Sequence, residues 1–187
     1  MHLESPLRFE IRPARPEEFT RLGQLLVAVY AGLAGMPTLQ QQPDYYAMLA
    51  DVGRRASNPA ITVLTATSSA GELLGSVDFI ADMQHYASGG TAGSIVDAAG
   101  IRLLAVSPRY RGLGLGRALT QQCIERALER HRSRVILHTT KAMQTAWSMY
   151  ERLGFRRLPE IDFVQGTLEV FGFQLTLSQR DERKLQA

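Results

Sequence analysis

The residues best suited to chemistry form a short run of glycines and arginines between an apolar segment and a helix-like segment. The run is Arg111-Gly112-Leu113-Gly114-Leu115-Gly116-Arg117, and the apolar Leu104-Ala105-Val106 precedes it by a few residues. Glycine adopts positive φ and lets the backbone approach a ligand closely. Ahead of a helix, the N–H groups of such a turn join the unpaired donors of the first helical turn. With the charge of Arg109, Arg111 and Arg117 added, we expect this turn to bind a phosphate or diphosphate.

Three other interpretations of the glycine run fit less well. A nucleotide-binding P-loop requires Gly-Lys-Ser/Thr, which is absent from the sequence. The dinucleotide pattern requires a third small residue where this sequence has Arg117 or Leu119, and no acidic residue ends a strand about 20 residues later. In the third interpretation the glycines have a structural role alone, and permit a helix to pack closely on a strand. Phosphate binding accounts for both the glycines and the arginines.

A second motif, 30 residues further on, makes the segment more specific. The first motif has the form Arg/Gln-x-x-Gly-x-Gly/Ala, present as Arg111–Gly116. The second has the form Ala-x-x-x-Tyr-Glu-x-Leu-Gly-Phe, present as Ala146-Trp147-Ser148-Met149-Tyr150-Glu151-Arg152-Leu153-Gly154-Phe155. In this order, over about residues 100–156, the pair resembles the GCN5-related N-acetyltransferase (GNAT) superfamily.

The resemblance implies acetyl-CoA as the acetyl donor and a site within a split sheet. The strands at 101–106 and 135–140 would diverge, and pantetheine would pair with the backbone of Leu104, Ala105 and Val106. The diphosphate would bind at the turn that comprises Arg111, Gly112, Leu113, Gly114, Leu115 and Gly116, with Arg117 beside it. Met143 stands where the family often has an asparagine that contacts pantetheine, so Thr139, Thr140 or Lys141 would supply that polar contact.

The resemblance also implies a catalytic acid at Tyr150, which would protonate the departing CoA thiolate. A phenol with a pKa of about 10 holds its proton at neutral pH, although a plain core tyrosine would fit the same helix face. The family often has a glutamate near the start of the strand before the glycine turn, but residues 97–102 contain none. Asp97 is the nearest carboxylate and our candidate base. Asp78, Asp82, a chain of waters or no base at all are the alternatives.

The acceptor side carries no motif. Glu160 and Asp162 follow the second motif, and acids there would favour a cationic amine, although ordinary surface acids fit equally well. Three tyrosines of the N-terminal half are candidates to lie over the same cleft, although core aromatic residues fit equally well: Tyr30, Tyr45 and Tyr46. We interpret His138 as a satisfied residue on a strand, and Cys123 as a buried, inert thiol.

The periodicity of the chain predicts one mixed α/β (α+β) domain over residues 8–178, followed by a polar tail at 179–187. Apolar and turn residues predict a strand and two helices, then a hairpin, and then further strands and helices. The predicted strands are 9–13, 61–67, 73–81, 101–106, 135–140, 155–157 and 170–177. The first predicted helix begins at Pro16 and is ended by Gly32, Gly35 and Pro37. The other predicted helices cover about 44–55, 114–130 and 143–153, and residues 85–99 form a long loop. The resemblance implies a central mixed sheet splayed between its fourth and fifth strands.

Composition limits the remaining classes of function. The 187 residues are 45% hydrophobic with a net charge of +3, which suits one globular domain and gives no reason to expect nucleic acid or a membrane as a partner. A single cysteine excludes an internal disulfide and a cysteine-based metal centre, so we expect no metal. No leader-like segment is seen at the N-terminus, and we expect a cytoplasmic location.

Together these features predict an N-acetyltransferase that moves an acetyl group from acetyl-CoA to a primary amine by direct attack. The alternative is a non-catalytic acyl-CoA-binding or regulatory module with the same fold, which the missing glutamate keeps open. The acceptor is a small-molecule or peptide amine that the sequence does not identify. Because dimers are common in the family, a homodimer is also left open.

Overall fold

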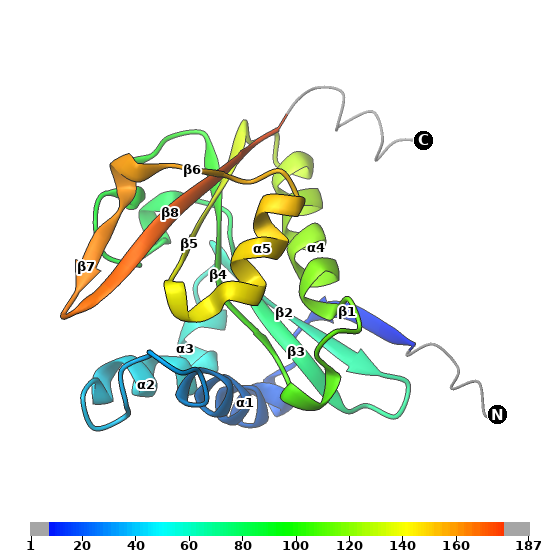
Figure 1. Cartoon of the computed structure of the whole chain (residues 1–187). Helices are drawn as coiled ribbons and strands as arrows, with labels where there is room; N and C mark the ends of the chain where they lie inside the picture. Colours follow the sequence, from blue (N-terminus) through cyan, green and yellow to red (C-terminus); the bar gives the residue numbers. More distant parts are fainter. Residues whose placement is uncertain (1–7, 178–187) are drawn as a thin grey trace.

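The computed structural model describes residues 8–177, which build one twisted sheet with helices on both faces (Figure 1). The sheet order is β1-β2-β3-β4-β5-β8-β6, and β7 pairs with β8 outside this path. All pairs are antiparallel except β4–β5, which is parallel. The strands are β1 (Phe9–Pro13), β2 (Ile61–Ser68), β3 (Leu73–Ile80), β4 (Ala98–Val106), β5 (Arg134–Thr139), β6 (Arg156–Arg157), β7 (Phe163–Gln165) and β8 (Leu168–Thr176). The predicted mixed α/β class is confirmed.

The helices form two layers. On one face, α1 (Phe19–Ala31), α2 (Pro43–Ala50) and α3 (Val52–Ala56) share a core with side chains of β2, β3 and β4. On the other face, α4 (Leu115–Glu129) and α5 (Gln144–Arg152) cover a second core around Leu64, Phe79 and Phe173. Within residues 8–177, no helix is long and apolar enough to cross a membrane.

Two details of the predicted elements are wrong, each for a local reason. The helix predicted at 44–55 is two helices, because Asp51 leaves the helical conformation and its carboxylate caps α3 by accepting from Arg54 N at 3.0 Å. Sequence reasoning also missed β7, which forms a hairpin with β8 through Gly166 at φ +64°. The predicted tail at 179–187 lies outside the described residues.

The central sheet splits between its fourth and fifth strands, as predicted. Parallel pairing joins Ala98–Ile101 of β4 to Arg134–Leu137 of β5 and then stops. The rest of β4, from Arg102 to Val106, stays paired with β3, whereas His138 and Thr139 of β5 stay paired with β8. The two strands therefore leave an opening at their carboxyl ends, where ligands bind in many α/β folds.

A β-bulge in β4 sits at the start of this opening. Asp78 pairs with Arg102 and Ser76 with Ala105, so β4 has one residue more than β3 across this stretch. Leu103 takes up the extra length with φ +53°, a left-handed conformation that is uncommon for leucine. Before the bulge, Ile101 faces the core under α4, and after it Leu104 and Val106 do so. The bulge thus changes which side chains face each side of the opening.

Candidate functional site

A cavity of about 810 Å³ lies at the opening between β4 and α5. Its floor is formed by the part of β4 that has left β5, one end by the glycine turn and the start of α4, and the far wall by α5 and by α1. The residues that line this cavity include Tyr30, Leu104, Val106, Arg111, Gly112, Gly114, Leu115, Gly116, Arg117, Met143, Ala146 and Arg152. The cavity therefore connects an apolar strand end with a basic, glycine-rich turn.

The glycine turn has the geometry of an anion-binding site. Gly112 and Gly114 have φ +79° and +81°, and a Cβ at either position would meet nothing within 4 Å. Gly114 O accepts the first helical hydrogen bond of α4, from Ala118 N at 3.0 Å. The N–H groups of Leu115, Gly116 and Arg117 therefore have no helical acceptor. Donors with no helical acceptor beside an open space are what a phosphate requires.

The structure brings most of the predicted donor-binding residues together. Leu104, Val106, Arg111, Arg117 and the turn between the two arginines line the larger cavity, except for Leu113. Leu113 projects outward and is 52% exposed. Ala105 is buried in the core on the α1 face and does not line the cavity. Leu104 O already accepts a hydrogen bond of 3.3 Å from the Tyr30 hydroxyl.

Only two of the three expected arginines face this cavity. Arg111 and Arg117 line it, but Arg109 is 3.8 Å from Glu72 and lies over the Tyr110 ring. Sequence reasoning missed Arg152, which reaches the same cavity from the end of α5. Its variable position in the second motif, between Glu151 and Leu153, gave no sign of this role.

A second, smaller cavity of about 100 Å³ adjoins the first. The two share four lining residues: Tyr30, Leu104, Met143 and Ala146. The smaller cavity extends along the other side of the opening, toward β5, β7 and the loop before β4. Tyr150 and Thr139 line this smaller cavity. The paired cavities therefore have the glycine turn in the larger compartment and Tyr150 in the smaller one.

Tyr150 combines burial with an unused hydroxyl. It is 5% exposed, and its ring packs edge-on against Phe155 with the ring centroids 5.7 Å apart. Within residues 8–177 its hydroxyl has no hydrogen-bond partner. Burial raises the pKa of Tyr150 well above its usual value. The phenol therefore keeps its proton at all ordinary pH values.

The polar residues expected around pantetheine are distributed between different places. Thr139 Oγ1 is buried without a hydrogen-bond partner and lines the smaller cavity. Thr140 lines the same cavity. Lys141 lies outside both cavities and pairs with Glu169 at 2.9 Å.

None of the three carboxylates weighed as a base lines either cavity. Asp97 is exposed and precedes the end of β4 that pairs with β5, roughly 16 Å along the strand from Arg102. Asp78 is buried in an ion pair with Arg55 at 2.7 Å, and Asp82 caps a short turn through Gln84 N. From these positions the carboxylates do not face a bound acceptor.

The acidic residues expected near the acceptor also lie elsewhere. Asp162 is bound by Arg157 at 2.6 Å and by Gly172 N at 2.7 Å, and these hydrogen bonds lower its pKa against the opposing effect of burial. Glu160 is exposed and outside both cavities. Of the three tyrosines, Tyr30 and Tyr45 line the smaller cavity, but Tyr46 is buried with its hydroxyl on Pro37 O. The predicted acidic acceptor site is therefore not present among the described residues.

Sequence reasoning missed two polar residues that do line the smaller cavity, Arg102 and His138. His138 Nε2 is 2.9 Å from Ile161 O, so it donates, and Nδ1 is left to accept from the Tyr86 and Ser88 hydroxyls at 3.1 and 3.3 Å. Burial lowers the pKa of His138, which keeps the ring neutral near pH 7. His138 is thus a satisfied strand residue, as interpreted from sequence, and its accepting nitrogen, Nδ1, is reached through the Tyr86 and Ser88 hydroxyls. The one sequence signal was its place at the end of the fifth strand.

Comparison with known proteins decides the family. The model of the acetyltransferase (GNAT) family matches residues 26–155, which is more than half of the chain. The chain belongs to the GNAT family. Glucosamine 6-phosphate N-acetyltransferase of Trypanosoma brucei brucei is 31% identical over 110 residues, which cover 59% of this chain and 67% of that protein. The structure of PaiA N-acetyltransferase from Thermoplasma acidophilum, in complex with coenzyme A, has a TM-score of 0.69 at 16% identity and covers 91% of this chain and 100% of that one.

Other relatives in the GNAT family are matched over shorter segments. N-acetylaspartate synthetase of Danio rerio is 34% identical over 84 residues, covering 42% of this chain and 30% of that protein. This chain therefore spans less than a third of the length of that relative.

Proposed function

We propose that the protein is an N-acetyltransferase that transfers the acetyl group of acetyl-CoA to a primary amine. The observation that carries this proposal is the continuous pair of cavities in the split sheet. One end of the pair is a glycine turn with the geometry of an anion-binding site, Leu104 of β4 lies at the junction of the two compartments, and Tyr150 lines the smaller one. Such an arrangement suits a long substrate with a phosphate at one end and a reactive thioester at the other.

The donor fits the residues that are present. The diphosphate would be held by the N–H groups of residues 112–117 and by the side chains of Arg111 and Arg117, since guanidinium groups and helix N-termini both favour phosphate. Pantetheine would lie along Leu104 and Val106, where β4 has no neighbouring strand on the β5 side. Its amide groups would then find partners in that unpaired backbone.

The proposed acetyl transfer uses groups that line the smaller cavity. The amine nitrogen attacks the thioester carbon, a C–N bond forms, and the C–S bond breaks. Tyr150 donates its proton to the departing sulfur and is reprotonated from solvent. The proton that the amine loses passes to the Ser88 hydroxyl, and the proton of that hydroxyl moves to His138 Nδ1, 3.3 Å away. No carboxylate among the described residues lines either cavity, so we assign the base to His138 in place of Asp97.

The relatives support the class of reaction. Among them are proteins named N-acetylaspartate synthetase and glucosamine 6-phosphate N-acetyltransferase, and both names specify acetylation of an amine. Both acceptors named there are small molecules that also carry an anionic group. We therefore propose a small-molecule amine over a peptide as the acceptor. The homodimer and the cytoplasmic location stay predictions.

The test is release of CoA from acetyl-CoA in the presence of an amine panel, combined with calorimetric titration of CoA. We expect CoA to bind and its release to depend on one class of amine, with the acetylated amine detected by mass spectrometry. Tight CoA binding without amine-dependent release across cationic, neutral and anionic amines would support the non-catalytic module and overturn the enzyme.

Replacing Gly114 by alanine is expected to weaken CoA binding about tenfold. A left-handed conformation costs a residue with a Cβ about 1–2 kcal/mol, so the turn would relax and its N–H groups would lose their common direction. The matched control is Gly71→Ala, because Gly71 has φ +77°, equally open surroundings and a place in the β2–β3 turn. Both variants should lose similar stability in thermal unfolding. An unchanged CoA dissociation constant for Gly114→Ala would remove the turn from the donor site.

Replacing His138 by glutamine is expected to lower kcat by about 100-fold or more while CoA affinity stays the same, as is usual when a general base is removed. The amide keeps a donor for Ile161 O but supplies no basic nitrogen. Steady-state kinetics at several pH values are the measurement. If the variant retains the rate and the pH profile of the parent, His138 is a structural residue.

A further inference from the structure

The smaller cavity contains one formal charge, and it is positive. Among its lining residues the titratable groups are three tyrosines near the opening, Tyr150 among them, together with Tyr86, His138 and Arg102. Burial raises the pKa of Tyr45 to about 12, partly offset by the charge of Arg102, and burial raises that of Tyr30 as well. These phenols are therefore neutral at pH 7, as is His138. Arg102 alone determines the electrostatic character of the compartment.

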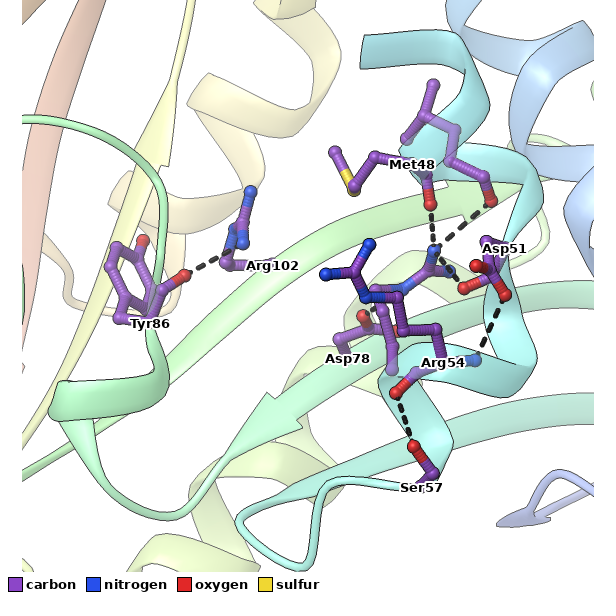
Figure 2. A network of polar contacts seen from close by, with 9 residues as sticks. Met48, Asp51, Arg54, Ser57, Asp78, Tyr86 and Arg102 are labelled. Carbon is purple, nitrogen blue, oxygen red and sulfur yellow. Dashed lines mark hydrogen bonds and ion pairs between the residues drawn. The ribbon is translucent and has the colours of Figure 1, made fainter. Parts of the chain in front are cut away.

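Arg102 forms no salt bridge among residues 8–177, although its charge acts on the Asp78 carboxylate. Its Nη1 donates to Tyr86 O at 2.8 Å, and its guanidinium lies over the Tyr86 ring, 5.8 Å from the centroid. Asp78 is opposite Arg102 in the β3–β4 register, but that carboxylate is bound by Arg55 at 2.7 Å. Figure 2 shows Arg102 beside Tyr86, apart from the contacts that gather around Asp78 and Asp51. Its charge is therefore available to a ligand.

The fold holds this guanidinium in place. Arg102 immediately precedes the bulge at Leu103, so it is the last residue before the strand changes face. Tyr86 is fixed against β4 because a Cβ at Gly100 would lie 2.4 Å from the Tyr86 ring, a space that only glycine leaves free. The backbone acceptor and the ring therefore restrict this half-buried side chain, which lines the smaller cavity.

We propose that Arg102 binds a carboxylate of the acceptor, and that the acceptor is a small amino acid. This inference rests on the proposed acetyl transfer and specifies its substrate class. The amine must lose its proton before it attacks, so an amino acid with one carboxylate reacts with a net charge of −1, which one guanidinium balances. The planar fork of arginine also matches a carboxylate in two parallel hydrogen bonds.

Two other acceptor classes fit this compartment less well. A polyamine would add positive charge next to Arg102 where no carboxylate is available. A phosphate monoester carries about two negative charges at neutral pH, and the compartment holds one cation for them. The volume of about 100 Å³ also favours a small molecule over a peptide chain.

The experiment compares matched acceptors with the complete protein. Small amino acids, their carboxamides, an aminoalkyl phosphate and spermidine are assayed for CoA release, with rates expressed per concentration of unprotonated amine. We expect kcat/KM for the best amino acid to exceed that of its carboxamide by at least about 100-fold, since a site built for a polar group rejects the analogue that lacks it. Arg102→Gln should abolish this ratio, and Arg102→Lys should keep part of it.

Controls separate a specific role from a loss of structure. Arg21→Gln removes an exposed arginine of α1 that lines neither cavity, and it should leave the ratio unchanged. CoA affinity and melting temperature of Arg102→Gln show whether the donor side and the fold persist. If the protein acetylates carboxamides or spermidine as well as amino acids, the inference about Arg102 is wrong and the acetyltransferase proposal stands. If no amine in the panel promotes CoA release, the proposed function itself fails.

Discussion

Tyr150→Phe is expected to lower kcat by about 100-fold or more while the dissociation constant of CoA stays the same. The hydroxyl has no hydrogen-bond partner among the described residues, so its removal leaves no unsatisfied group behind. Its ring contact with Phe155 remains in the variant. Burial keeps the pKa of this phenol high, so the Tyr150 hydroxyl is protonated. Replacing Tyr150 by phenylalanine therefore removes a proton donor and no negative charge. The measurements are single-turnover kinetics and CoA titration.

The matched control for this variant is Tyr46→Phe. Tyr46 is also buried, but it lines neither cavity and its hydroxyl donates to Pro37 O at 2.8 Å. We expect that control to lose about 1 kcal/mol of stability and no activity, the reverse of the Tyr150 variant. An unchanged kcat in Tyr150→Phe would mean that the CoA thiolate leaves without this acid.

The geometry of the proposed donor half of the site was predictable from sequence because its determinants are local. Gly112, Gly114 and the start of α4 are consecutive, and the left-handed turn that they form depends only on neighbouring residues. Arg111 and Arg117 lie within the same turn. The split between β4 and β5 followed from the family resemblance, and the end of their pairing at Ile101 confirms it.

The acceptor half could not be predicted in the same way. Arg102, His138 and Tyr86 come from β4, β5 and the loop before β4, and only the folded sheet brings them to one compartment. Asp97 was chosen from sequence because it is the carboxylate nearest to the position where the family often has a glutamate. In the structure it lies at the other end of β4 from the opening. No local pattern relates these positions, because their distances depend on the register of two strands.

The bulge at Leu103 explains part of this difficulty. Simple alternation along β4 would keep Ile101 and Leu103 on the same face, but Leu103 packs with α1 and Leu104 faces the α4 side. The extra residue exists only relative to β3, so a single strand does not reveal it. The bulge therefore could not be predicted from the sequence of β4 alone, and neither could the faces of the residues that follow Arg102.

The acceptor compartment is supported from beneath by a buried ion pair. Arg55 of α3 donates to Asp78 of β3 at 2.7 Å and to the carbonyls of Met48, Leu49 and Asp51 at the end of α2 (Figure 2). One side chain thus attaches α2 and α3 to the sheet. Because α2 carries Tyr45 over the smaller cavity, this network also positions one wall of the acceptor site.

Arg55→Met is expected to destabilise the protein by about 3–5 kcal/mol, because it leaves the Asp78 carboxylate buried without its partner. Burial already raises the pKa of Asp78, and Arg55 opposes that effect. Without Arg55 the pKa in the folded state rises further above that of the unfolded chain. Stability is then fully present below the unfolded pKa and is lost as the pH rises through the folded one. We therefore expect urea unfolding to show a larger deficit at pH 8 than at pH 5.

Two comparisons distinguish a buried charge from a simple loss of packing. Arg54→Met changes the exposed neighbour on the same helix and should cost less than about 0.5 kcal/mol at either pH. The double variant Arg55→Met with Asp78→Leu removes both charges, and it should recover most of the stability and lose the dependence on pH, since apolar residues often replace a buried ion pair without cost. A deficit in Arg55→Met that is equal at pH 5 and pH 8 would show that lost contacts to the α2 carbonyls, and not the unpaired Asp78, account for the destabilisation.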